Sequence, residues 1–129
     1  MTKPFYKFKS LILSIVFFAL ALLSALSISL SALAADQTVE MLNKLGKENM
    51  VFSKKIVKVD VGDTVSWKAT KPGHNVEFIK GGFPKGVEKF RSPLSKDTEY
   101  KFKIPGIYAY WCTPHKGMGM IGFVLVGND

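Results

Sequence analysis

Hydrophobic and polar residues alternate along most of the chain after residue 36. Val57, Val59 and Val61, for example, are separated by Lys58 and Asp60, and this period of two is typical of a strand with one buried face. A first strand is predicted to begin with residues 38–42, before a loop rich in Gly, Lys and Asn, and further strands are predicted at 57–61, 64–69, 74–79, 99–103, 107–111 and 121–126. Seven or eight short strands with turn residues between them predict an all-β, single-domain fold, a Greek-key β-sandwich.

Two segments depart from this alternation. Residues 80–97 are interrupted by several glycines and prolines, which predicts an irregular excursion between strands. Residues 112–120 lie between the last two predicted strands, so we expect them to form a hairpin loop at one end of the sandwich. His74 begins a predicted strand that can reach the same end, which would bring residues from distant parts of the sequence together.

Residues 1–34 differ in composition from the rest of the chain. Three lysines precede an almost wholly apolar run over residues 11–30, and Ala32 and Ala34 are small residues suited to a cleavage position. This order is typical of a secretory signal peptide, so we expect export, cleavage after Ala34 and a folded domain over residues 35–129. An uncleaved membrane anchor is the alternative, because the apolar run approaches the ~20 residues that span a bilayer.

The charge balance of the chain is basic, with a formal net charge of +8. Without the three lysines of the leader, 15 basic and 10 acidic residues remain, a net charge of +5. The lysines are spread through strands and loops and form no cluster with arginine, which argues against a nucleic-acid partner. A docking face for an acidic protein partner fits this distribution better, and a merely solvated basic surface is the alternative.

Metal-binding side chains are concentrated in the nine residues from Cys112 to Met120. The segment contains the only cysteine of the chain, the second of its two histidines, His115, and also Met118. Thiolate, imidazole and thioether form a soft, mixed donor set that suits a copper ion alternating between Cu(I) and Cu(II), and the other histidine, His74, can complete it. One cysteine excludes an intramolecular disulfide, and a metal would occupy a thiol that is otherwise a liability in an exported protein.

These residues and their neighbours resemble pseudoazurin, a type 1 (blue) copper protein of the cupredoxin fold. The similar motifs are CTPHKGMGM at 112–120, GHNVE at 73–77, MLNK at 41–44, MVF at 50–52, GDTV at 62–65 and EKF at 88–90, so the resemblance covers essentially the whole of the chain after the leader. It implies one type 1 copper ion per chain, with four ligands: His74, Cys112, His115 and Met120. Met118 is the alternative axial ligand, because its spacing from His115 is that of the shorter loop of amicyanin. Asn75 is expected to tie the ligand-bearing loops together by hydrogen bonds.

The resemblance implies one-electron transfer and not catalysis, because four protein ligands leave no position for a substrate. It implies a periplasmic monomer with no small-molecule substrate, which docks transiently on a redox protein with an acidic surface, a reductase or cytochrome, for example a nitrite reductase. Pseudoazurins usually continue with two helices after the last strand, whereas this sequence ends at Asp129, and Trp111 stands where a docking lysine often appears. These two departures leave open a donor and acceptor that differ from those of typical pseudoazurins. A periplasmic copper chaperone or storage protein is the alternative function.

Overall fold

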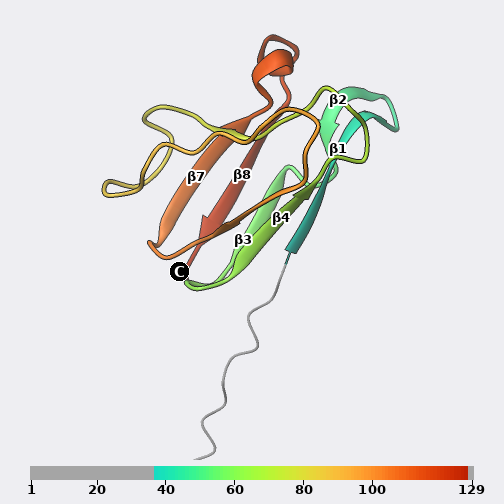
Figure 1. Ribbon diagram of the computed structural model, residues 1–129. Coiled ribbons are helices and arrows are strands. Elements are labelled where there is room, and N and C mark those ends of the chain that lie inside the picture. The colour runs from blue at the N-terminus through green and yellow to red at the C-terminus, as the bar shows by residue number, and fades with distance from the viewer. Residues whose placement is uncertain (1–36, 128–129) are drawn as a thin grey trace, which may run out of the picture. The chain divides into compact units, whose positions relative to one another are not determined.

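Residues 37–127 are described by the structure, a computed structural model, and they form two four-stranded sheets packed face to face (Figure 1). The elements are β1 (Gln37–Leu45), β2 (Glu48–Phe52), β3 (Ile56–Val59), β4 (Thr64–Lys68), β5 (Glu77–Phe78), β6 (Thr98–Lys101), β7 (Gly106–Trp111), the 3₁₀ helix η1 (Thr113–Met118) and β8 (Ile121–Val126). The strand orders are β2-β1-β4-β6 and β3-β8-β7-β5. The predicted all-β sandwich is thereby confirmed.

Each sheet contains one parallel and two antiparallel pairings. Strand β1 runs parallel to β4, and β3 runs parallel to β8, whereas β7 and β8 form an antiparallel pair over six residue positions. The predicted alternation is visible in the burial of β4, where Val65 and Trp67 are fully buried, and of β7, where Tyr108 and Tyr110 are fully buried. Both sheets therefore contribute one apolar face to a shared core.

Aromatic side chains fill the middle of this core. The ring of Tyr110 lies edge-on to Phe52 and to Trp67, with centroid separations of 4.9 and 5.2 Å. On β8, Gly122 leaves room for the same ring, because a Cβ atom there would come within 2.5 Å of the Tyr110 hydroxyl oxygen. Nearer the start of β7, the Tyr108 hydroxyl donates a 2.7 Å hydrogen bond to the carbonyl of Ile104. The close fit of Tyr110 against Gly122 thus holds β7 and β8 in their antiparallel register.

Several predicted element boundaries are wrong. Residues 48–52 belong to β2, although they were expected to lie partly in a loop after the first strand. The segment 74–79 forms a strand only at Glu77–Phe78, because the preceding residues bond to the irregular excursion; for example, the Ser95 amide donates to the His74 carbonyl. Strand β3 ends at Val59, before a turn in which Val61 is 51% exposed. Turn formation and pairing with loops decide these boundaries, and neither is encoded in the alternation.

The predicted leader, residues 1–34, lies outside the described residues, and so does its possible role as a membrane anchor. Within residues 37–127, no helix has the length and apolar character needed to cross a membrane.

Candidate metal centre

One end of the sandwich carries η1, drawn in orange at the top of Figure 1 beyond the ends of β7 and β8. Cys112 directly follows β7 and Met120 directly precedes β8, as the sequence predicted. The loop between them is helical and not irregular: proline stands in its first turn, and Gly119 ends it with a left-handed φ of 80°. The Cys112 amide donates a 3.0 Å hydrogen bond to the Met120 carbonyl. The two flanking strands thus hold both ends of the loop in place.

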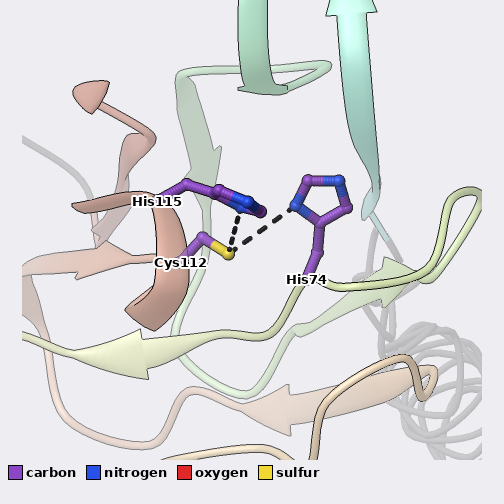
Figure 2. A group of neighbouring side chains, drawn as sticks. All are labelled: His74, Cys112 and His115. Atoms are coloured by element: carbon purple, nitrogen blue, oxygen red, sulfur yellow. Dashed lines mark hydrogen bonds between the residues drawn. The ribbon is translucent and has the colours of Figure 1, made fainter. Parts of the chain in front are cut away.

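Three of the predicted ligands converge on one point (Figure 2). The Cys112 Sγ atom lies 3.7 Å from His74 Nδ1 and 3.4 Å from His115 Nδ1. The donor atoms of all three residues lie within 4.8 Å of one another, although His74 is 38 residues away from Cys112 in the sequence. Cys112 and His74 are fully buried, and His115 is half-buried. The structure therefore brings together the thiol and both imidazoles that the sequence singled out.

The two methionines of the segment occupy different environments. Met120 is 1% exposed and belongs to the apolar core that also contains Cys112, whereas Met118 is 58% exposed at the end of η1. The Met120 amide also donates a 3.3 Å hydrogen bond to the carbonyl of His115. Burial in the same core cluster as Cys112 favours Met120 over Met118 as a fourth candidate donor.

Asn43 on β1 orients the ring of His74. Its amide oxygen lies 2.8 Å from His74 Nε2, so that nitrogen carries the ring proton and the Nδ1 lone pair faces Cys112. Burial lowers the pKa of His74, and the nearby charge of His115 lowers it further. Both effects keep the ring neutral, which is the form that binds metals. Sequence reasoning missed this partner: Asn43 appeared only within a family motif, and only the meeting of β1 with the His74 loop reveals its role.

The Cys112 thiol is held in its protonated form when no cation is near. Burial raises the pKa of the thiol, and the backbone amides of Asn75 and His115 only partly offset this effect. A bound metal ion would supply the positive charge that favours the thiolate, which is the ligating form. The site is therefore built to ionise its cysteine on binding a metal and not to expose a free nucleophile.

Asn75 joins the two ligand-bearing segments, as the sequence predicted. Its Oδ1 accepts a 2.8 Å hydrogen bond from the Thr113 amide, and its Nδ2 donates 3.0 Å to the Thr113 hydroxyl. A second bond from Nδ2 reaches the Ser92 carbonyl over 3.3 Å. Because Asn75 follows His74 and Thr113 follows Cys112, this amide fixes the spacing of two candidate ligands without any metal.

Comparison with known proteins agrees with this geometry. The family of copper binding proteins described as plastocyanin/azurin matches residues 39–127. A putative pseudoazurin of Rhizobium leguminosarum bv. viciae is 46% identical over 99 residues, which are 77% of this chain and 65% of the relative. A pseudoazurin of Paracoccus pantotrophus is 40% identical over 110 residues, or 85% of this chain and 76% of the relative. The chain thus spans slightly less than two thirds of the Rhizobium relative.

Solved structures show the same fold. The pseudoazurin of Methylobacterium extorquens AM1 superposes with a TM-score of 0.71 at 36% identity, covering 74% of this chain and 77% of that one. The native pseudoazurin of Hyphomicrobium denitrificans gives a TM-score of 0.70 at 38% identity, with coverage of 74% and 77%. The match of sequence, fold and donor set confirms the resemblance inferred from the motifs and the copper cofactor that it implied. The chain belongs to the plastocyanin/azurin family of copper-binding proteins.

Proposed function

We propose that this protein is a one-electron carrier, not an enzyme, in which His74, Cys112, His115 and Met120 hold one type 1 copper ion. The observation that carries the proposal is the convergence of one thiol and two imidazoles, with a buried thioether beside them. Two imidazoles, a thiolate and a weak axial thioether are the donors of blue copper sites, and the ion they bind alternates between Cu(II) and Cu(I). The match to the plastocyanin/azurin family supports the same function.

The rigidity of the donor set suits electron transfer. Three features hold the side chains in place without a metal: the backbone hydrogen bond from Cys112 to Met120, the hydrogen bonds of Asn75 to Thr113, and the contact of Asn43 with the His74 ring. Donor atoms that are fixed by their surroundings move little when the charge of the site changes. A small rearrangement allows fast exchange of an electron, whereas a copper chaperone needs donors that release the ion readily.

His115 is the proposed point of electron exit. It is the one half-buried member of the three converging residues, and its neighbours Pro114, Lys116 and Met118 are exposed. Small apolar surfaces of this kind suit brief encounters with a partner protein. The basic charge of the chain favours a partner with an acidic surface, a reductase or a cytochrome, of which a nitrite reductase is one example. This chain would act as a monomer that takes no nucleic acid or small-molecule substrate.

We place this function in the periplasm. The support is the leader-like order of residues 1–34, with cleavage after Ala34 releasing a plastocyanin-like domain over residues 35–129. Mass spectrometry of the protein recovered from the periplasm of an expressing bacterium tests this placement. A mature N-terminus at Ala35 supports it, and a full-length, membrane-bound product contradicts it in favour of an anchor.

The decisive experiment on the site is the visible spectrum of the copper-loaded protein. An intense blue colour from thiolate-to-copper charge transfer, reversible one-electron voltammetry and retention of copper against a chelator are expected. Cys112→Ser should lose the colour, while Met118→Leu, which changes an exposed side chain of the same loop, should keep it. Colourless binding of Cu(I) alone, with ready loss to the chelator, would instead identify a chaperone or storage protein.

Electrostatic docking has its own test. The rate of electron exchange with an acidic redox protein is expected to fall as the ionic strength rises, because salt screens the attraction between the basic and acidic surfaces. A rate independent of salt would show that the lysines only solvate the surface.

A further inference from the structure

Glu77 is a charged residue in the middle of a largely buried segment. It lies in β5 between Val76 and Phe78, which are 0% and 1% exposed, and its own side chain is 12% exposed. Its neighbour across the sheet is Trp111, the residue directly before Cys112. A carboxylate in such a place is costly unless it is hydrogen-bonded, so its partners indicate why it is there.

One oxygen of this carboxylate receives two hydrogen bonds. Oε2 accepts 2.8 Å from the Thr113 hydroxyl and 3.0 Å from the Trp111 indole N–H. The other oxygen lies 4.0 Å from Nζ of Lys89, which is 74% exposed. The bond from Trp111, helped by that from Thr113 and by the charges of Arg91 and Lys89, outweighs burial and lowers the pKa of Glu77. The group is therefore a carboxylate at neutral pH.

The hydrogen bond to Glu77 decides how the Thr113 hydroxyl bonds to Asn75. A threonine hydroxyl has one hydrogen, and Thr113 donates it to Glu77. The Thr113 oxygen is then left to accept from Asn75 Nδ2, and Asn75 Oδ1 is turned toward the Thr113 amide. An acceptor at position 77 thus reinforces the orientation of the Asn75 amide that the Thr113 N–H and the Ser92 carbonyl also require.

The hydrogen-bond network of Glu77 involves residues that adjoin two of the candidate ligands in the sequence. Asn75 follows His74, Thr113 follows Cys112, and Trp111 precedes Cys112. We propose that Glu77 is a positioning residue of the copper site. Its carboxylate stabilises the two hydrogen bonds between Asn75 and Thr113 (the Thr113–Asn75 clamp), and its fixed negative charge favours Cu(II) over Cu(I). The second half of this proposal rests on the proposed function, and the first half concerns the metal-free protein alone.

The first experiment uses the copper-free protein. Amide hydrogen exchange of Thr113, followed by NMR, reports the bond that Asn75 Oδ1 accepts. Glu77→Leu removes both the acceptor and the charge, and we expect at least about a tenfold loss of protection, equivalent to ~1.4 kcal/mol. Glu99→Gln is the matched control, because Glu99 is an exposed carboxylate on β6 and its loss changes the net charge equally. Unchanged protection in Glu77→Leu would overturn the positioning role.

A second variant tests whether Glu77 acts through Thr113 or serves only to accept the hydrogen bond of the Trp111 indole. Trp111→Phe removes one donor to Glu77 and leaves the Thr113 hydroxyl bond in place, so protection of the Thr113 amide should stay within about twofold of wild type. An equal loss of Thr113 amide protection in Trp111→Phe and Glu77→Leu would overturn the positioning role, because the carboxylate would then act only by binding the indole of Trp111.

The copper-loaded protein tests the charge. Glu77→Gln keeps the shape of the side chain and one acceptor oxygen, so the clamp and the colour should persist. The ratio of Cu(II) to Cu(I) at a given applied potential should fall roughly threefold to tenfold, a rise of the midpoint of up to ~59 mV. A midpoint equal to that of wild type and Glu99→Gln would overturn the electrostatic role. A wild-type protein without blue copper would refute the proposed function and leave the hydrogen-exchange result standing by itself.

Discussion

Tyr110 provides a quantitative test of the core because its hydroxyl group is buried without a hydrogen-bond partner. The side chain is 0% exposed, and neither its hydroxyl nor Trp67 Nε1 finds a partner among residues 37–127. Burial raises the pKa of Tyr110 to about 12. Replacing Tyr110 with phenylalanine removes both the unsatisfied hydroxyl and its titration. We expect Tyr110→Phe to stabilise the copper-free protein, and to do so increasingly in alkali.

The expected magnitudes follow from these two properties. At neutral pH, removal of an unsatisfied buried hydroxyl should raise the free energy of unfolding by about 1 kcal/mol. In alkali, the unfolded tyrosine ionises through its ordinary pKa of 10.0, while the folded one stays protonated up to about 12. Wild type therefore loses stability progressively between these values, by ~1.4 kcal/mol at about pH 11 and by ~2.7 kcal/mol in full. The phenylalanine variant has no such loss.

The assay is chemical denaturation of both copper-free proteins, followed by circular dichroism at several pH values from about 8 to about 11. The difference between the two free energies of unfolding is the informative quantity, because all other titrating groups occur in both proteins and cancel. Tyr100→Phe is a useful control, since Tyr100 is only half-buried and its variant should diverge less from wild type. A difference that stays constant over this range, or a variant less stable than wild type at about pH 8, would refute the reasoning.

Three further outcomes are expected. Met120→Leu should alter the colour and raise the reduction potential of the copper-loaded protein, whereas Met118→Leu should change neither, because only Met120 is buried beside the donors; equal spectra for both variants would point to neither methionine as a ligand. Gly122→Ala should cost about 2 kcal/mol or more in denaturation experiments, because its Cβ would overlap the Tyr110 ring, and a cost below about 0.5 kcal/mol would show that the ring can move. The folded-state pKa of Glu77 lies below the ordinary 4.5, so its contribution to stability is present above that value and is lost as the pH falls through the lowered pKa. The free energies of unfolding of wild type and Glu77→Gln, measured as a function of pH, should therefore converge in acid. A difference between them that stays constant with pH would contradict this.

The meeting of Cys112, His74 and His115 could be predicted from the sequence because their chemistry is concentrated and unusual. One cysteine, two histidines and a short segment with two methionines leave few ways to assemble a soft metal site. The alternation of apolar residues predicted the sandwich for a similar reason, since each strand has to bury one face. The position of Met120 directly before β8 likewise followed from the beginning of the apolar run at 121–126.

The supporting contacts could not be predicted because they depend on pairings between distant segments. Asn43 reaches His74 only because β1 and the loop after β4 meet at the same end of the sandwich. Glu77 looked like an ordinary polar position of an alternating strand, and its register opposite Trp111 gives it a role. The register of two strands is a tertiary property, so these polar residues carried no local signal that distinguished them from solvent-facing ones.

The place of β8 has a consequence for the order in which the protein is made. Strand β8 lies between β3 and β7, so the second sheet lacks one of its two interior strands until residues 121–126 have been made. Up to that moment Cys112 has been synthesised but lacks the bond from its amide to the Met120 carbonyl. The pairing of β8 with β3 joins segments that are far apart in the sequence, and such pairings form slowly. Until β8 pairs, the second sheet is incomplete and the Cys112 thiol lacks the full burial that it has in the folded domain.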